Sequence, residues 1–390
     1  MAFSALLLLA GWTTAQQVSL PQVFADAEKQ TKLMLAEIPA AKGNSTDLVS
    51  PRTLDKGALK LVPSKDWTSG FFPGECWFLY EYSGKPEWKS VAQTYTANIE
   101  KEKMNGGTHD MGFKIYCSFG TGYRLTKDPH YKDVIVQAAK TLSTRFNPKV
   151  GTLKSWDNRK WSYPVIIDNM MNLELLFAAT RLTGDSSFYK IAVSHARTTM
   201  KNHFRKDYSS YHVVSYDTLT GKPIERVTHQ GYADESAWAR GQAWGLYGYT
   251  MCYRETKNKA FLDQAEHIAA FILHHPNMPA DGVPYWDFNA PNIPNEPRDA
   301  SAAAVLASGL YELSGYSKNG AAYRQAADKI LQSLTNHYRS PIGENHGFIL
   351  LHSTGSKPQD SEVDVPLSYA DYYYLEALLR YKKLQAVRKK

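Results

Sequence analysis

Two kinds of apolar segment alternate along this chain, and both repeat with helical spacing. In the first kind, apolar residues recur every three or four positions, and polar residues fill the positions between them. Between residues 129 and 146, for example, Val134, Ala138 and Leu142 follow one helical row, with polar residues in the row beside it. This spacing predicts six amphipathic helices, over residues 21–38, 86–101, 129–146, 186–204, 259–275 and 321–338.

The second kind of segment is rich in glycine, alanine and aromatic residues and is poor in charge. A helix that is apolar on every side is a buried helix. Six such segments lie at residues 70–82, 111–125, 169–182, 237–253, 300–313 and 367–381, and short polar turns follow the first four. The alternation predicts an all-α chain folded as an (α/α)6 toroid, with buried helices at its centre and amphipathic helices around them.

One segment departs from helical spacing. Residues 212–224 alternate apolar and polar positions on both sides of Thr220-Gly221. Alternation around such a turn is typical of a β-hairpin. We therefore expect a small β-hairpin insertion on a long loop of the toroid.

Composition is that of a globular protein with a sizeable core. The 390 residues are 43% hydrophobic, which is enough for one large domain or two ordinary ones. The net charge is +7, which is compatible either with a soluble surface or with attraction of an acidic substrate. Basic residues are scattered and form no stripe with interleaved aromatics, so no nucleic-acid partner is expected. Neither composition nor charge predicts an oligomeric state.

Cysteine usage argues against a disulfide framework. Cys76, Cys117 and Cys252 lie inside apolar helical patterns, which predicts buried free thiols. Neither C-x-x-C nor H-E-x-x-H spacing occurs, so no metal site is predicted.

The first fifteen residues differ from the rest. An apolar run at residues 5–10 is followed by Gly-Trp-Thr-Thr-Ala-Gln, with small residues where a signal peptidase cuts. We expect residues 1–15 to be a secretory signal peptide with a shortened or missing basic region. The run is too short to span a bilayer, so we expect a periplasmic protein with no membrane partner.

Unusual polar residues gather at the starts of the buried helices. They are Asp66-Trp67, His109-Asp110, Asp168, residues 234–240, Arg298-Asp299 and Asp364. In a toroid of antiparallel hairpins the buried helices all start at one end, so these groups should converge on one mouth. The alternative is capping, because an aspartate at a helix start accepts backbone N–H bonds and suits the helix dipole. Asp299, before Ala-Ser-Ala-Ala, fits a cap best.

Two aspartates fit capping poorly. Asp110 follows His109 and precedes Met-Gly-Phe, where the glycine permits close approach. Asp168 has apolar neighbours on both sides in Val165-Ile-Ile-Asp-Asn-Met-Met171, so its carboxyl should be desolvated and its pKa raised. A raised pKa suits a general acid near neutral pH, and paired carboxylates are a common glycosidase arrangement.

The segment 229–245 combines indole, guanidinium and carboxamide groups. Trp238, Gln242 and Gly245 share one helical face, and Arg240 and Trp244 lie on an adjoining face. Indole rings stack on apolar sugar faces and arginine matches a carboxylate, which predicts a site for a sugar that carries an anion. Three glycines in this helix predict close approach, by the ligand or by a neighbouring helix.

Four further candidates lie on loops or on the hairpin. His212 is either an exposed strand residue or part of the site, and Trp156 and Trp161 belong either to the core or to the site's rim. Lys357 follows Ser353-Thr-Gly-Ser356 and is the kind of residue that meets a sulfate, although most loop lysines are only solvated.

Four motifs together resemble glycoside hydrolase family 88, the unsaturated glucuronyl hydrolases. They are Asp66-Trp-Thr-Ser-Gly-Phe-Phe-Pro-Gly74, Thr108-His-Asp-Met-Gly-Phe113, Ile167-Asp-Asn-Met-Met-Asn-Leu173, and His229-Gln-Gly-Tyr with Trp238-Ala-Arg-Gly-Gln-Ala-Trp244. The resemblance covers about residues 20–385 and implies a single catalytic domain there with the (α/α)6 fold. It also implies a substrate, a lyase-generated glycosaminoglycan-type oligosaccharide that ends in a 4,5-unsaturated uronate, and hydration of the C4=C5 enol ether.

The resemblance assigns roles residue by residue. Asp168 matches the acid/base and Asp110 the second carboxylate. Trp67 matches a stacking residue, and the other substrate-site matches are His109, His212, Gln230, Trp238, Arg240 and Trp244. Ser353, Ser356 and Lys357 loosely resemble a sulfate-binding segment, with a different lysine spacing. No metal or organic cofactor is implied.

Three other functions compete with this hypothesis. An unsaturated rhamnogalacturonyl hydrolase would act by the same chemistry on pectin fragments. A non-catalytic carbohydrate-binding protein would keep the aromatic residues without needing Asp168 in apolar surroundings. A polysaccharide lyase on a related toroid would create the double bond instead of consuming it.

Overall fold

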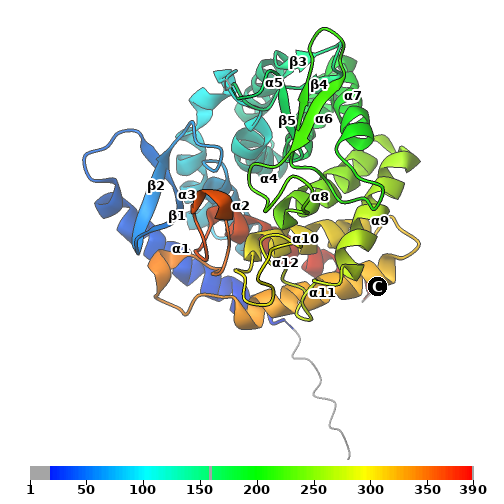
Figure 1. The fold of residues 1–390 in the computed structure, drawn as a ribbon. Coiled ribbons are helices and arrows are strands. Elements are labelled where there is room, and N and C mark those ends of the chain that lie inside the picture. Colours follow the sequence, from blue (N-terminus) through cyan, green and yellow to red (C-terminus); the bar gives the residue numbers. More distant parts are fainter. Residues whose placement is uncertain (1–17, 158–159, 389–390) are drawn as a thin grey trace, which may run out of the picture.

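The fold is built from two concentric rings of helices (Figure 1). The structure is a computed structural model and describes residues 18–157 and 160–388. The outer helices are α1 (Leu20–Lys42), α3 (Pro86–Ala97), α5 (Pro129–Ser143), α7 (Ser186–Asn202), α9 (Lys259–His274) and α11 (Gly320–His337). The inner helices are α2 (Phe71–Ser83), the π-helix η2 (Gly112–Gly120) continued by α4 (Thr121–Thr126), α6 (Asn169–Thr183), α8 (Ala239–Thr256), α10 (Ala300–Leu313) and α12 (Ser368–Arg388).

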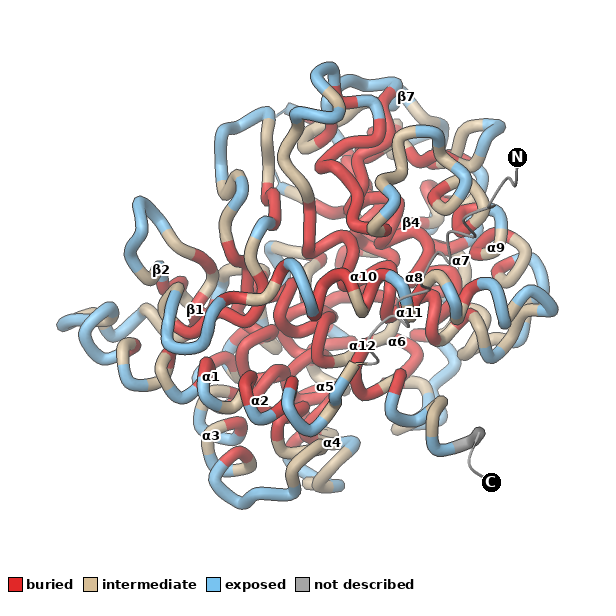
Figure 2. Tube along the Cα trace, turned by 90° about the horizontal axis from the view of Figure 1, so that it is seen from below, coloured by how far each residue is buried: buried red, intermediate tan, exposed pale blue. Residues whose placement is uncertain are grey.

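The inner helices close into a ring. In order, α2 contacts η2, η2 contacts α6, α6 contacts α8, α8 contacts α10, α10 contacts α12, and α12 contacts α2 again. The outer helices pack against the inner helices next to them in the chain. Figure 2 shows that buried residues follow the inner helices and that exposed residues lie on loops and outer helices. The predicted (α/α)6 toroid is confirmed.

The polar turns after three inner helices begin the outer helices. The side chains of Asp128, Asp185 and Asn258 accept a hydrogen bond from the backbone N–H two residues later, at 2.9, 2.8 and 3.1 Å. Such caps satisfy N–H groups that have no partner within the helix. The repeated turn in the sequence is therefore the start signal of α5, α7 and α9.

The second inner helix begins as a π-helix, which apolar spacing alone did not predict. Gly112 lies so close to α6 that an added Cβ would be 2.6 Å from Asn172 Cα. The Oδ1 atom of Asn172 accepts a hydrogen bond from Phe113 N at 3.0 Å. A side chain of α6 therefore takes up a backbone donor at the point where the helix is wider than normal.

A three-stranded antiparallel sheet lies outside the rings. Its order is β5 (Pro164–Ile166), β6 (Val213–Tyr216) and β7 (Pro223–Val227). The β6–β7 pair confirms the predicted hairpin, and β5 adds a strand from the segment before α6. Ile166 pairs with Val213, and Ile167 N donates to His212 O at 3.1 Å. This register brings Asp168, at the start of α6, beside His212, at the start of β6.

A second hairpin, β1 (Leu48–Asp55) with β2 (Ala58–Pro63), was missed by the sequence prediction. Its register shifts twice, between Leu48 and Ser50 and between Pro51 and Thr53. Each shift changes the face on which later side chains lie, so the alternation that signals a strand is lost. The short pair β3 (Phe146–Asn147) and β4 (Thr152–Leu153) and the turns η1 (Glu100–Met104), η3 (Asn345–Gly347) and η4 (Lys357–Gln359) complete the elements.

The sequence also predicted free cysteines, a signal peptide and no membrane-spanning segment. Cys76, Cys117 and Cys252 are free and buried, as predicted. The predicted signal peptide over residues 1–15 lies outside the described residues. In the part of the chain that the structure describes, no helix has the length and apolarity needed to cross a membrane.

Candidate active site

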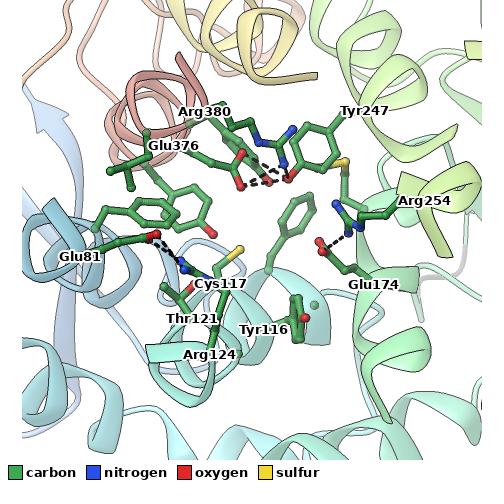
Figure 3. A pocket seen from close by; sticks show the side chains of 18 of the residues that line it. Glu81, Tyr116, Cys117, Thr121, Arg124, Glu174, Tyr247, Arg254, Glu376 and Arg380 are labelled. Carbon is green, nitrogen blue, oxygen red and sulfur yellow. Dashed lines mark hydrogen bonds and ion pairs between the residues drawn. The ribbon is translucent and has the colours of Figure 1, made fainter. Parts of the chain in front are cut away.

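Two cavities lie at opposite ends of the inner helices. The larger, of about 320 Å³, is lined by residues of α2, η2, α4, α6, α8 and α12 and reaches the last turns of α2, α6 and α8 (Figure 3). The smaller, of about 90 Å³, lies among residues that precede the inner helices or begin them. Phe113 contributes to the walls of both.

The larger cavity is ringed by charges that pair with one another. Arg124 donates to Glu81 at 2.8 Å, and Arg254 and Arg380 each approach Glu312 at 2.8 Å. Arg254 also pairs with Glu174, and Glu376 accepts a hydrogen bond from Tyr247, as Figure 3 shows. These contacts join α2, α4, α6, α8, α10 and α12. Because these opposite charges pair with one another across helices, we assign them a structural role in holding the inner helices together.

The smaller cavity collects the residues predicted to carry chemistry, so it is the candidate active site. Its lining includes six predicted site residues: Trp67, His109, Asp110, Asp168, Gln230 and Arg240. Phe113, Trp156 and Ile166 complete the lining. The ring topology explains the convergence, because inner helices of antiparallel hairpins all begin at the same end.

Asp168 is the central acid of this pocket. It occupies the N-cap position of α6, yet its side chain makes no capping hydrogen bond there to any described group. The residue is 8% exposed. Burial raises the pKa of Asp168 to about 7; Arg240 opposes the rise and Asp110 adds to it. The predicted raised pKa is therefore supported, and the carboxyl is free to act as an acid near neutral pH.

Asp110 is the second carboxylate of the pocket and is held by its neighbours in the chain. Its Oδ1 atom lies 3.2 Å from His109 Nε2, and its Oδ2 atom accepts a hydrogen bond from Thr108 Oγ1 at 2.8 Å. His109 is buried, and burial lowers the pKa of its imidazole although Asp110 opposes this. The pocket thus combines one carboxyl with a raised pKa and one supported by polar contacts.

His212 and Trp238 lie just behind the pocket wall. His212 Nε2 lies 3.6 Å from Asp168 Oδ2, and the imidazole lies 4.5 Å from the indole of Trp238, centroid to centroid. Trp238 also lies 4.6 Å from the Arg240 guanidinium. Both residues are buried. The β5–β6 register explains why His212 meets Asp168, so its interpretation as an exposed strand residue is wrong.

Arg240 lines the pocket but is already engaged by the protein. Its Nη1 atom donates to Asp299 Oδ2 and to Thr354 O, both at 2.6 Å, and its Nη2 atom donates to Gly355 O at 2.5 Å. Three of its five N–H groups are thus used within the protein, and the contact with a substrate carboxylate stays a prediction. Its charge still faces the pocket.

The loop that Arg240 holds carries the candidate sulfate contacts. Ser353 is buried, Ser356 and Lys357 are partly exposed, and none of the three belongs to the lining of the pocket. The loop nevertheless borders the site, because Gln230 Nε2 donates to Gly355 O at 3.1 Å. Arg52 in β1 binds the same loop through Glu362 at 2.5 and 2.9 Å. Sequence patterns gave no signal for Arg52, since its hairpin was missed.

Trp244 does not lie where a stacking residue would. It is fully buried in α8 and packs against Phe113 and Tyr373, with ring centroids 5.3 and 5.4 Å apart. Its helical spacing from Arg240 was predicted correctly, but the face it occupies points into the barrel. The Trp244 indole N–H contributes to the surroundings of Asp168 and favours the charged form of that carboxyl. Trp67 and Trp156 are the tryptophans that line the pocket.

The other aspartates at the mouth have structural partners. Asp299 caps α10 through Ser301 N and Ala302 N, as predicted, and it also binds Arg240. Asp66 accepts bonds from Thr68 N and Arg52, Asp234 from Thr228 N, and Asp364 lies 2.7 Å from His352. Within residues 18–157 and 160–388, no group of three or more His, Cys, Asp or Glu side chains could hold a metal ion.

Comparison with known proteins gives a consistent result. The Glycosyl Hydrolase Family 88 model matches residues 47–384. An unsaturated glucuronyl hydrolase of Formosa agariphila is 53% identical over 329 residues, 83% of this chain and 82% of the relative. An unsaturated chondroitin disaccharide hydrolase of Streptococcus pneumoniae is 34% identical over 347 residues, 86% of this chain and 87% of the relative. The crystal structure of an unsaturated glucuronyl hydrolase specific for heparin matches with a TM-score of 0.87 and 50% identity, over 93% of this chain and 98% of that one. The chain therefore belongs to Glycosyl Hydrolase Family 88.

Proposed function

We propose that this enzyme is an unsaturated glucuronyl hydrolase that removes the 4,5-unsaturated uronate from lyase-generated glycosaminoglycan-type oligosaccharides. The observation that carries the proposal is Asp168, a buried carboxyl at a helix start that is not used as a cap and whose pKa is raised to about 7. The names of the relatives support the same substrate class.

The chemistry begins at the enol ether of the unsaturated ring. Asp168, protonated near neutral pH, donates its proton to C4, and positive charge develops at C5 and the ring oxygen. Asp110, which lines the same pocket, stabilises this charge. The resulting Asp168 carboxylate then takes a proton from water as the water attacks C5. The hemiketal opens to a 4-deoxy-5-keto-uronate, and the remaining saccharide leaves.

The remaining pocket residues suit binding of an acidic sugar. Trp67 and Trp156 offer aromatic surface, and Gln230 offers an amide. Arg240 contributes positive charge, which attracts the uronate carboxylate, although three of its five N–H groups bind the protein. The loop with Ser353, Ser356 and Lys357 borders the pocket and is proposed to contact the sugar that follows the uronate.

Loss of the double-bond ultraviolet absorbance on an unsaturated chondroitin or heparin disaccharide tests the proposal. We expect Asp168→Asn to reduce turnover at least about 1,000-fold while leaving disaccharide binding largely intact. Asp185→Asn is the matched control, because Asp185 caps the outer helix α7 at the opposite end of α6 from Asp168. Near-normal turnover by Asp168→Asn would contradict the assignment.

The same assay separates the competing functions. A binding protein would leave the absorbance unchanged, and a lyase would raise it on intact polysaccharide. Preference for rhamnogalacturonan fragments over glycosaminoglycan fragments would favour the pectin-type hydrolase.

We also propose that residues 1–15 direct export to the periplasm, where lyase products would be met. The apolar run and the small residues after it support this. A mature chain starting near residue 16 in the periplasmic fraction is the expected result by mass spectrometry. A full-length chain confined to the cytoplasm would contradict it.

A further inference from the structure

The imidazole of His212 is held by two backbone donors. His229 N and Gln230 N each donate a hydrogen bond to His212 Nδ1, both at 3.1 Å. An atom that accepts two N–H bonds carries a lone pair and no proton. In a neutral imidazole the single proton then resides on the other ring nitrogen. The loop after β7 therefore selects the tautomer of His212 with its proton on Nε2.

The protonated nitrogen of this tautomer faces the acid of the site. His212 Nε2 lies 3.6 Å from Asp168 Oδ2. Both atoms are buried, and neither has a hydrogen-bond partner among the described residues. The separation exceeds an N–H···O bond by about 0.6 Å, a distance comparable to ordinary side-chain displacement. A donor and an acceptor that are otherwise unpartnered thus face one another across a short gap.

We propose that His212 is a positioning residue, locked as a neutral Nε2–H donor by the 229–230 amides, that engages Asp168 Oδ2 and so leaves the transferable proton on Oδ1. A carboxyl oxygen that accepts an N–H bond does not also carry the proton. The donor therefore determines which oxygen of Asp168 delivers the proton to the substrate. This role differs from direct contact with the sugar, and it rests on the proposed function only where it invokes proton delivery.

The surroundings of the pair keep the proton on Asp168. Protonating His212 at Nδ1 would break both amide bonds and set an N–H against two N–H groups. Burial lowers the pKa of His212 well below its usual range, and the nearby His229, Arg240, His203 and His109 add to this. The groups that act on Asp168 are Arg240, Asp110 and the Trp244 indole. Below about pH 7 the pair is therefore a neutral acid beside a neutral imidazole, and it does not become an ion pair.

A tautomer measurement tests the inference independently of activity. Nitrogen NMR of the full chain with ¹⁵N-labelled histidine should show His212 with an unprotonated Nδ1 and a protonated Nε2 from about pH 5 to about pH 9. The His212→Gln variant assigns the signal by its disappearance. A proton on Nδ1, or conversion to imidazolium in this range, would overturn the proposal.

Kinetic variants separate positioning from sugar binding. His212→Leu should lower kcat about 10- to 100-fold with little change in KM, and it should move the alkaline limb of kcat/KM to higher pH, because a donor that favours the carboxylate is lost. His212→Gln retains an amide N–H and should recover part of the rate and the original limb. A rise in KM alone, with an unmoved limb, would show a sugar-binding role instead. If the wild-type enzyme does not act on unsaturated disaccharides, the proposed function fails while the tautomer result still stands.

Discussion

Asp168 and Asp299 occupy equivalent positions at the starts of two inner helices and have different roles. Asp299 accepts bonds from Ser301 N at 3.1 Å and Ala302 N at 3.2 Å, and it pairs with Arg240. These contacts give the Asp299 carboxyl hydrogen-bond and ion-pair partners within the protein. The Asp168 side chain makes no capping bond that the described residues reveal, and its burial favours the neutral form. Local partners, more than position on the helix, decide which aspartate can donate a proton.

The raised pKa of Asp168 predicts a pH dependence. Asp168 must be protonated to donate its proton to C4, so kcat/KM should be lost as pH rises through about 7. Above that pH we expect a fall of about tenfold for each pH unit. Initial rates on an unsaturated disaccharide across a buffer series would measure this. An alkaline limb several units higher would mean that another group is the acid.

At the scale of elements, the β5–β6–β7 sheet and helix α8 place the site. The sheet register sets Asp168 beside His212, and α8 carries Arg240 to the pocket and Trp244 to the core. Gly248 of α8 lies against α6, where an added Cβ would be 2.5 Å from Met170 Cβ. At Gly245 the nearest atom would be 3.4 Å away, on the Phe204 ring. Close approach by a neighbouring helix therefore explains Gly248, while Gly245 has room for a methyl group.

These two glycines give a matched pair of substitutions. Gly248→Ala should destabilise the protein by about 1–3 kcal/mol, because the methyl group would force α6 and α8 apart. Gly245→Ala should be neutral or stabilising by up to about 1 kcal/mol, since alanine favours the helix. Urea denaturation followed by circular dichroism would compare them. Equal effects would show that the α6–α8 approach is not what requires glycine at position 248.

At the scale of the whole molecule, the candidate active site and the ion pairs that join the inner helices lie at different ends of the barrel. One end holds the two carboxylates, and the other is joined by ion pairs. The ring closes where α12 meets α2, and Glu75 and Asp371 are buried near this seam. Thr31 of α1 donates to Glu75 at 2.9 Å, and Ile349 N and Leu350 N donate to Asp371 at 3.0 and 2.8 Å. Burial raises the pKa of both carboxyls, that of Glu75 to about 7.

The seam predicts how stability changes with pH. Because the pKa of Glu75 rises from 4.5 to about 7 on folding, the folded state binds more protons across that range. Its contribution to the free energy of unfolding is full below pH 4.5 and is lost as pH rises through about 7. Glu75→Gln should therefore be relatively more stable above pH 7 than below pH 5, compared with the wild type. Melting temperatures at several pH values would test this, and parallel curves for the two proteins would contradict it.

The sequence by itself determined the number and alternation of the helices, the β6–β7 hairpin and the two site carboxylates. These features follow from local spacing, because burial repeats with helical period and because Asp168 has apolar neighbours in the chain itself. Apolar spacing could not find the β1–β2 hairpin, whose bulges erase the alternation.

Only the tertiary structure decided which groups meet. It turned Trp244 into the core, and it bound the Arg240 guanidinium to Asp299 and to the backbone carbonyls of residues 354 and 355. It also set the His212 tautomer through the amides of residues 229 and 230. The physical reason is that a hydrogen-bond partner far away in the chain leaves no periodic trace near the residue it binds. Local pattern encodes burial, whereas the protonation and orientation of a buried polar group depend on whichever donors and acceptors the fold brings to it.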